Sequence, residues 1–261
     1  MDEVHQLKVV STSNADSLGH RAQQAVAAAM GDSIDYRLIG GHMVRLLLEL
    51  YPCSRVTARS TLDADAAVDE VSVIAPATQA FVDAGFNKTA GNAFVMETGD
   101  LQRLEINILL ARSGATAGLR ATTVAGVGQV STLPELTFAL NRPGLMIDVA
   151  AEIGLDQTIH YRTRIPDLES AVVLKAHAWH GRRMAKDLAD LNSPLEIRQE
   201  HGLSPWALDS SPLKGHRLDT ARILQPLADS LTKIHTGFQV PGDINRPRLA
   251  ALIKEHIASV P

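Results

Sequence analysis

The chain has 261 residues, of which 45% are hydrophobic, 21% charged and only 4% aromatic. This length suits one large domain or two of ordinary size, and the composition is that of a globular protein. No apolar run approaches the roughly 18 residues that a membrane-spanning helix requires. The acidic start MDEVHQLKVV is unlike a signal peptide, and the single cysteine, Cys53, excludes a disulfide framework. We therefore expect a cytoplasmic protein with no membrane partner.

The net charge of −4 gives no overall attraction to nucleic acid. Binding to nucleic acid needs basic groups that neutralise phosphates, and a local patch can supply them on an acidic protein. The second half of the chain offers such a set: Arg162, Arg164, Arg182, Arg183 and Lys186.

The predicted elements change character along the chain. In the first part we expect helices over 17–30, 42–51 and 76–85, and strands over 36–39 and through Asp63, Asp65 and Ala67. Strands at 92–97 and 101–110 are joined by a hairpin turn at Thr98-Gly99-Asp100, and more strands are expected at 135–141, 145–150 and 158–164. Helices follow at 167–180, 184–200, 217–235 and 246–258. This segregation predicts an α+β fold, with a mixed β-sheet in an N-terminal domain (1–165) and a mainly helical C-terminal domain (166–261).

Asp63 and Asp65 are the first candidates for chemistry. Side chains two apart on a strand point to the same face, so both carboxylates enter one space. Two adjacent negative charges repel unless protons or a cation intervene, and Mg²⁺ prefers such hard oxygen ligands together with substrate phosphates. The alternative for a short D-x-D pattern is a solvated strand edge or turn.

Gly40-Gly41 lies where a predicted strand meets a predicted helix. Glycines at such a junction let backbone amides approach a phosphate, and the helix N-terminus adds a favourable dipole. The alternative is a plain tight turn. The order strand, Gly-Gly, helix and Arg-x-Thr-x-Asp-x-Asp favours a phosphate site beside a metal-binding carboxylate pair.

Three segments of the chain resemble the DNA polymerase β-type nucleotidyltransferases, and more narrowly the AbiEii/MenT-like toxins. They are Gly40-Gly41 with Arg59-Ser60-Thr61-Leu62-Asp63-Ala64-Asp65, then Arg162-Thr163-Arg164-Ile165-Pro166, then Leu174-Lys175 with the segment 182–191. The resemblance covers roughly residues 35–192. It implies a nucleotidyltransferase fold in the N-terminal domain and nucleotide-binding roles for Gly40, Gly41, Arg59 and Thr61. Small residues around the acidic pair, Ala64 and Ala66-Ala67, and His42 after the glycines depart from the family pattern and leave the pocket shape open.

The resemblance also implies a third carboxylate, and Glu105 is the candidate. In Leu104-Glu105-Ile106-Asn107-Ile108 the apolar side chains face one way and Glu105 the other. It would act as a metal ligand or as a base toward the acceptor hydroxyl. A solvent-facing glutamate on a half-buried strand is the alternative.

Lys175 stands in the apolar stretch AVVLKAHAW, where it either extends to the surface or enters a cleft. Helical spacing suggests that it shares a face with Trp179, Arg182 and Lys186, although Gly181 interrupts that spacing. The resemblance favours Lys175 as a ligand of the triphosphate, in a cleft between the two domains.

Asp187 has two interpretations. It pairs with Arg183 or Lys186 along the helix, or, as the resemblance implies, it orients Lys175 or acts on the incoming hydroxyl. Asp190 is expected to be structural. His177 and His180 are three residues apart, but no zinc-binding motif accompanies them. Cys53 likewise lacks a recognisable catalytic partner in the sequence.

Together these features predict a Mg²⁺-dependent nucleotidyltransferase, with Mn²⁺ as an alternative cofactor. Its catalytic residues are Asp63, Asp65, Glu105, Lys175 and Asp187. The resemblance implies an NTP donor, the 3′ end of tRNA as acceptor, and a toxin with a cognate antitoxin protein. A protein or small-molecule acceptor, and a degenerate fold that only binds a partner, are the alternatives.

Overall fold

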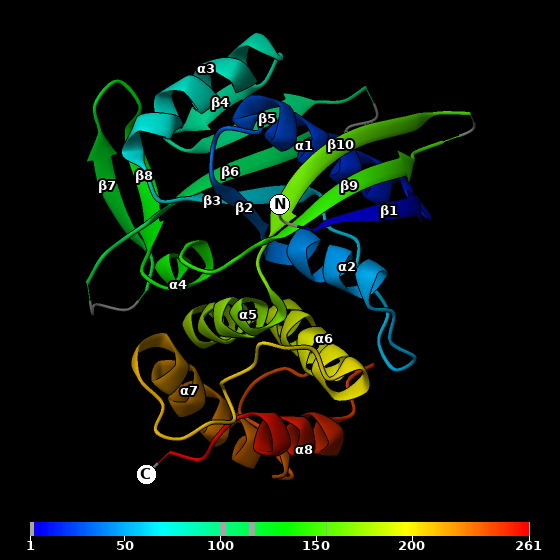
Figure 1. Ribbon diagram of the computed structural model, residues 1–261, viewed down its shortest axis with the longest axis vertical. Coiled ribbons are helices and arrows are strands. Elements are labelled where there is room, and N and C mark those ends of the chain that lie inside the picture. The colour runs from blue at the N-terminus through cyan, green and yellow to red at the C-terminus, as the bar shows by residue number, and fades with distance from the viewer. Residues whose placement is uncertain (1–2, 100–102, 115–117, 155, 261) are drawn as a thin grey trace. The chain divides into compact units, whose positions relative to one another are not determined.

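The computed structural model describes residues 3–99, 103–114, 118–154 and 156–260. The chain divides into two compact units, one made of Met1–Leu50 and Arg59–Asp167, the other of Tyr51–Ala58 and Leu168–Pro261. The first unit holds mixed β-sheets and the second is helical (Figure 1), which confirms the predicted α+β fold.

The first unit contains every strand of the described chain. Its elements are β1 (Val4–Val10), α1 (Asn14–Met30), β2 (Tyr36–Ile39), α2 (Gly40–Leu50), β3 (Asp63–Val68), a 3₁₀ turn (Val71–Val73), α3 (Ile74–Asp83), β4 (Asn87–Ala90), β5 (Ala93–Glu97), β6 (Arg103–Ala111), β7 (Arg120–Val124), β8 (Gly128–Leu133), α4 (Leu136–Leu140), β9 (Leu145–Glu152) and β10 (Thr158–Ile165). They form a three-stranded sheet, β1-β9-β10, and a larger mixed sheet with the order β2-β3-β6-β5-β4, to which the β7–β8 hairpin is joined through β6.

Alternation along β3 and β6 gives the larger sheet an apolar face and a polar face. Ala64 and Ala66 on β3, and Ile106 and Ile108 on β6, are fully buried, whereas the residues between them are half-buried. Phe94 on β5, opposite Ile106 in the register, packs against Phe81 of α3 with ring centroids 4.9 Å apart. Asp63 and Asp65 therefore lie on the polar face by the period-2 alternation of the strand.

Helix α1 contacts both sheets of the first unit (Figure 1). Its side chains take part in a chain of buried polar groups. Tyr161 Oη donates to Gln23 Oε1 (3.0 Å) and lies 2.8 Å from His20 Nδ1, while Gln23 Nε2 lies 2.9 Å from His42 Nδ1. Because the Gln23 oxygen accepts from Tyr161, its amide group donates to His42. The neutral His42 ring then carries its proton on Nε2. This chain ties α1 to β10 and to the first turn of α2.

A buried ion pair, Arg45 with Asp16, adds a second link between α2 and α1. Burial works to raise the pKa of Asp16, but hydrogen bonds from Arg45, Ser60 and Thr12 lower it well below its usual range. Asp16 is therefore ionised, and its partners come from α2 and from the loop that precedes β3.

The second unit consists mainly of four helices within its described residues: α5 (Leu168–Arg182), α6 (Ala185–His201), α7 (Gly215–Leu231) and α8 (Arg246–His256). Segment Tyr51–Ala58, which the sequence-based division placed in the N-terminal domain, belongs to this unit. Its backbone hydrogen-bonds to the end of α6: His201 Nε2 donates to Pro52 O (2.9 Å), and Ser54 N donates to Glu200 Oε2 (3.3 Å). No helix among the described residues is both long and apolar enough to cross a bilayer.

One predicted strand is wrong. Residues 135–141 form α4 (Leu136–Leu140), because Leu136, Ala139 and Leu140 are buried at helical spacing after Pro134. The hairpin residue Asp100 and the first positions of the predicted strand 101–110 lie outside the described residues, and β6 is described from Arg103.

The buried histidines predict an acid-sensitive fold. Burial first, then nearby His20, lowers the pKa of His42 to about 3, and burial lowers that of His20 to about 4. The unfolded chain binds these protons near pH 6.5, so the free energy of unfolding falls as the pH drops from there. His42→Asn, which keeps an acceptor for Gln23, is expected to remove up to about 1.4 kcal/mol per pH unit of that dependence.

Urea unfolding of the wild type and His42→Asn between about pH 6 and about pH 4 measures this difference. Exposed His235→Asn is the control for replacing a histidine by asparagine outside the buried core. Equal slopes for the wild type and His42→Asn would contradict the assignment of a neutral, buried His42.

Candidate active site

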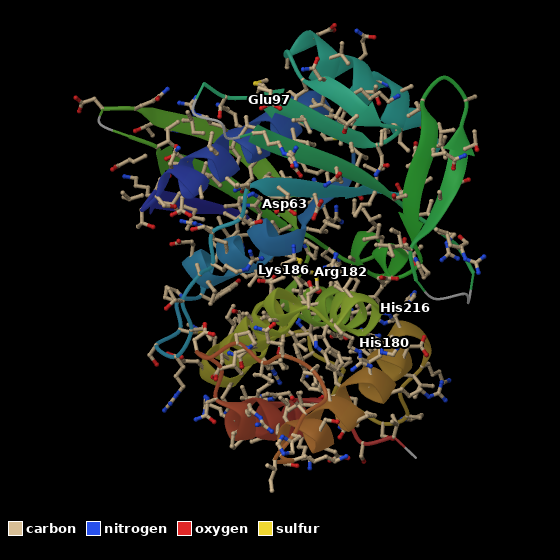
Figure 2. All side chains as sticks on the ribbon, turned by 180° about the vertical axis from the view of Figure 1, so that it is seen from behind. Asp63, Glu97, His180, Arg182, Lys186 and His216 are labelled. Atoms are coloured by element: carbon tan, nitrogen blue, oxygen red, sulfur yellow. The ribbon has the colours of Figure 1, made fainter. Side chains whose placement is uncertain are left out.

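Asp63 and Asp65 project from β3 onto the polar face of the larger sheet, as predicted. Both are half-buried, and each is held by a neighbouring donor. The Thr61 hydroxyl donates a short hydrogen bond to Asp63 Oδ1, and Asn107 Nδ2 donates to Asp65 Oδ1 at 3.0 Å. Figure 2 shows Asp63 on the ribbon of the first unit. The two carboxylates are thus oriented by the protein itself.

The first turn of α2 lies against Asp65 without a side chain between them. Gly40 has φ +73°, and a Cβ placed on it would lie 2.7 Å from Asp65 Oδ2. A Cβ on Gly41 would lie 3.0 Å from the Thr61 side chain and 3.1 Å from Arg59 Nη2. Gly40 is therefore required by close approach and by its backbone conformation, whereas a side chain at Gly41 would be tight against Thr61 and Arg59. The first amides of a helix have no partner within it, and in α2 these amides belong to the turn that packs against Asp65 and Thr61.

The loop before β3 is fixed from the side of α1. Asp16 accepts a hydrogen bond from Ser60, and a Cβ on Gly19 would lie 2.7 Å from the Thr61 carbonyl and 2.6 Å from the His42 ring. Thr61 is buried, whereas Arg59 is exposed and donates to Ser60 O at 3.2 Å. The segment therefore presents the Arg59 guanidinium beside the glycines and holds Thr61 against Asp63.

Glu105 lies beside Asp63 in the parallel register of β3 and β6, and Asn107 lies beside Asp65. All four side chains share the polar face. The Glu105 carboxylate forms an ion pair with Arg103 on its own strand. Glu105, the predicted third carboxylate, is therefore level with Asp63 in the sheet and is paired with Arg103.

The donor set fits a hard divalent cation. Asp63 and Asp65 supply carboxylate oxygens on one face of β3, beside Glu105 and Asn107 of β6. Among the described residues no three His, Cys, Asp or Glu side chains are arranged to hold a metal ion. A cation held by two carboxylates needs further oxygen ligands, and Mg²⁺ commonly takes these from water and substrate phosphates.

Lys175 and Asp187 belong to the second unit, and their local partners differ from those predicted. Lys175 Nζ donates to Asp190 (2.7 Å), and both side chains are about 5% exposed. Asp187 is buried and forms a two-pronged ion pair with Arg182, not with Arg183 or Lys186. The expectation that Asp187 orients Lys175 is therefore wrong, because Asp190, one turn farther along α6, occupies that position.

Only part of the predicted cationic strip lies on one helix. Lys175, Trp179 and Arg182 are on α5, which ends at Arg182, whereas Lys186 lies in the first turn of α6 (Figure 2). The Arg183 guanidinium instead stacks over the ring of Trp179, 4.0 Å from its centroid. The interruption between α5 and α6, where Arg183 has φ +54°, separates Lys186 from residues that an uninterrupted helix would align with it.

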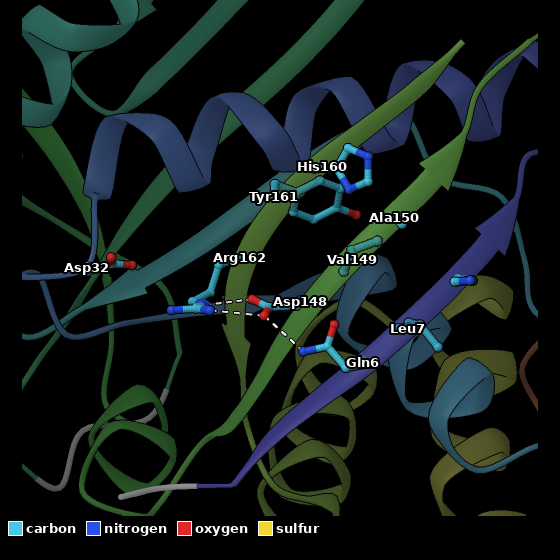
Figure 3. Close-up of a pocket in the computed structure, with 10 residues that line it drawn as sticks. Gln6, Leu7, Asp32, Asp148, Val149, Ala150, His160, Tyr161 and Arg162 are labelled. Carbon is cyan, nitrogen blue, oxygen red and sulfur yellow. Dashed lines mark hydrogen bonds and ion pairs between the residues drawn. The ribbon is translucent and has the colours of Figure 1, made fainter. Parts of the chain in front are cut away.

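The basic set singled out in the sequence is largely neutralised within each unit. Arg162 forms two hydrogen bonds with Asp148 on the exposed side of the β1-β9-β10 sheet, where they line a pocket of about 540 Å³ (Figure 3). Arg164 pairs with Asp35, and Arg182 with Asp187. These side chains already have anionic partners, so the expected phosphate-binding surface is weaker than the sequence suggests.

Two other sequence candidates are unsuited to chemistry in this geometry. Burial, followed by Glu200 and Glu196, raises the pKa of Cys53 to about 11, so this thiol is a poor nucleophile at neutral pH. Burial also lowers the pKa of His177 to about 4, with a further lowering by His216. His177 is thus a neutral ring packed against His216, with centroids 6.0 Å apart.

The sequence-based selection missed Asn107 and the supporting Asp16, and it expected Asp190 to be structural without identifying it as the partner of Lys175. Asn107 lies in the same alternating segment as Glu105, so its place on the polar side of that strand could have identified it. Asp190 lies one helical turn after Asp187, so spacing alone could not choose between them. Asp16 acts across 44 positions on Ser60, which no local pattern reveals.

Comparison with known proteins leaves the family open. No family model matches the chain, and no curated protein matches it. Among solved structures, an antigenic nucleotidyltransferase-like protein from Paracoccidioides brasiliensis is similar over 97% of this chain and 96% of that chain, with a TM-score of 0.40 and 15% sequence identity. A superposition of this quality assigns neither family nor function, so both depend on the site itself.

Gly40→Ala tests the close approach of α2 to Asp65. Gly31→Ala is the matched control, because Gly31 has φ +61° but nothing within 4 Å of the added Cβ. Both variants are expected to lose more than about 1 kcal/mol of unfolding free energy from backbone strain. Only Gly40→Ala also displaces Asp65, which a crystal structure of each variant shows directly. An unmoved Asp65 carboxylate in Gly40→Ala would contradict the packing described above.

The Lys175–Asp190 pair predicts that removing one charge lowers stability more than removing both. Lys175→Ala leaves a buried carboxylate without its cation and is expected to cost about 3–5 kcal/mol in urea unfolding. The double variant Lys175→Met with Asp190→Leu removes both charges and is expected to regain most of that loss. A double variant as unstable as Lys175→Ala would show that the pair does not act as a coupled buried charge pair.

Proposed function

We propose that the protein is a metal-dependent nucleotidyltransferase that moves NMP from an NTP to an acceptor hydroxyl. The observation that carries the proposal is a single corner of the first unit. There the Arg59 guanidinium and the start of α2 adjoin the carboxylates of Asp63 and Asp65. Groups of the kind that bind phosphate and groups of the kind that bind a divalent cation thus lie side by side, which supports the proposal. The sequence resemblance to AbiEii/MenT-like enzymes supports the same assignment.

The chain's own residues supply three functions in this proposal. Asp63 and Asp65 hold Mg²⁺ or Mn²⁺, and the start of α2 and Arg59 bind phosphate oxygens of the NTP. When bound, the cation supplies charge stabilisation of the phosphates. The acceptor oxygen forms a bond to the α-phosphorus, the bond between the α- and β-phosphates breaks, and pyrophosphate leaves. The hydroxyl proton passes to a carboxylate of the polar face, for which Glu105 is the candidate, or to water.

Lys175 and Asp187 stay predictions in this scheme. Lys175 would neutralise charge on the leaving pyrophosphate, and Asp187 would act near the acceptor. Lys175→Met with Asp190→Leu separates a role in catalysis from one in stability, because this double variant is expected to fold. Loss of transfer in that folded protein supports the role of Lys175, and full activity contradicts it.

The acceptor proposed from the resemblance is the 3′ end of tRNA. Adding a nucleotide there blocks aminoacylation, which would make the protein a growth-inhibiting toxin controlled by an antitoxin. Incubation with each α-labelled NTP together with total tRNA, total protein or small hydroxyl compounds identifies both donor and acceptor. Label on tRNA supports this acceptor, whereas label only on protein or a small molecule replaces it and keeps the chemistry.

Asp63→Asn is the direct test of the chemistry. It keeps the size of the side chain and the acceptor for Thr61, but removes a charge from the cation site. NMP transfer is expected to fall by at least about 10³-fold, equal to about 4 kcal/mol of transition-state stabilisation. Circular dichroism and urea unfolding report whether the fold is kept. Wild-type transfer by the folded variant would contradict the proposed site, and absence of Mg²⁺-NTP binding by the wild type would favour a binding module without catalysis.

A further inference from the structure

We propose that Asp16 is a positioning residue for the nucleotide site, because its carboxylate fixes loop 59–61 (Arg59-Ser60-Thr61) against helix α2. The inference rests on the proposed function, since this loop and the start of α2 form the two sides of the proposed phosphate site. Asp16 lies on α1 and does not need to touch substrate for this role.

The carboxylate of Asp16 binds both sides of this site at once. Arg45 of α2 donates to Asp16 Oδ1 in a buried ion pair, and the Ser60 side chain of the loop also hydrogen-bonds to the carboxylate. Because Asp16 and Arg45 are both buried, separating them would leave an uncompensated charge in the core. Asp16 is therefore a firm bridge between helix α2 and the loop.

The bridge acts on groups that would contact a nucleotide or its cation. Next to Ser60 lie Arg59, the proposed phosphate ligand, and Thr61, whose hydroxyl donates to Asp63 Oδ1. A Cβ on Gly41 would lie 3.0 Å from Thr61 Cγ2, so the first turn of α2 and the loop are in close contact. A shift of Ser60 therefore moves both of its neighbours relative to the start of α2.

Asp16 also has a local task at the N-terminus of α1. Its Oδ2 accepts hydrogen bonds from the Thr12 backbone N–H (3.1 Å) and hydroxyl (2.7 Å), while Ser13 Oγ accepts from Asp16 N (3.1 Å). A carboxylate in the first turn of a helix commonly serves such a cap alone. The cap accounts for the contacts with Thr12 and Ser13, but not for those with Arg45 and Ser60, which come from other elements.

The charge of Asp16 suits a bridge between several elements. Burial works to raise its pKa, but hydrogen bonds from Arg45, Ser60 and Thr12 lower that pKa well below the usual range. An ionised carboxylate has about four acceptor positions, so it can bind the helix cap, Arg45 and Ser60 together. Hydrogen bonds to a charged group are also stronger than those between neutral groups, which limits the movement of the loop.

Ser60→Ala tests the bridge, because it removes the link to the loop and leaves the ion pair between Asp16 and Arg45. Equilibrium dialysis of each α-labelled NTP with Mg²⁺ against the full chain measures the effect and needs no acceptor. NTP binding is expected to weaken about 3–10-fold, the size of one lost hydrogen bond. Gly19 still packs closely against the Thr61 carbonyl in this variant, which keeps the loss moderate.

Ser60→Thr is the conservative variant that distinguishes positioning from a general effect of substitution. It keeps a hydroxyl that can donate to Asp16, so NTP affinity is expected to stay within about twofold of the wild type. Ser60 is exposed, and urea unfolding is expected to give similar free energies for the wild type and both variants.

Thr12→Val is the matched control at the same carboxylate. Thr12 is exposed like Ser60, and its hydroxyl donates to Asp16 Oδ2, but it belongs to the cap of α1 and not to the loop. Its loss is expected to lower the free energy of unfolding while NTP affinity stays within about twofold of the wild type. Were Asp16 only a capping residue, neither Ser60→Ala nor Thr12→Val would change NTP affinity.

Three results would overturn the proposal while leaving the proposed function intact. They are wild-type NTP affinity in Ser60→Ala, a loss in Ser60→Thr as large as that in Ser60→Ala, and an equally large loss in Thr12→Val. A wild-type chain that binds no Mg²⁺-NTP is a different outcome, because it contradicts the proposed function and the role of Asp16 with it.

Discussion

The contact between the start of α2 and Asp65 is the constraint on which the rest of the first unit's site depends. Only glycine at position 40 permits both the positive φ and the approach to Oδ2. Because β2 runs into α2 without an intervening loop, the same contact places the helix N-terminus beside the carboxylates of β3. The helix end that we propose binds phosphate and the carboxylate pair that we propose holds a cation thereby become neighbours through this one close contact.

Buried polar groups hold this contact in place, and burial and their hydrogen-bond partners shift their pKa values. His42 and His20 are neutral because burial lowers their pKa values to about 3 and about 4, and Asp16 is ionised because Arg45, Ser60 and Thr12 bind it. The chain of donors through Gln23 links these groups to Tyr161 on β10. Polar cores of this kind specify one arrangement, since any shift leaves a buried group without its partner.

Local patterns in the sequence predict much of this arrangement, and their failures have identifiable causes. The strand Tyr36–Ile39, the helix after it and the alternation that aligns Asp63 with Asp65 are all set by nearby residues, and the structure confirms them. Strand β1 was missed because its partner, β9, lies about 140 positions away. The choice of Asp190 for Lys175, and of Arg182 for Asp187, depends on how α5 ends, which a single residue with φ +54° decides.

The central claim is that Asp63 and Asp65 together hold a divalent cation beside a nucleotide. Anomalous diffraction from crystals grown with Mn²⁺ and a non-hydrolysable NTP analogue tests it most directly. The account predicts a Mn²⁺ peak within about 2.0–2.3 Å of one oxygen from each aspartate, with phosphate oxygens completing the coordination. A Mn²⁺ peak elsewhere in the protein, or bound analogue with no metal at these two carboxylates, would contradict the account.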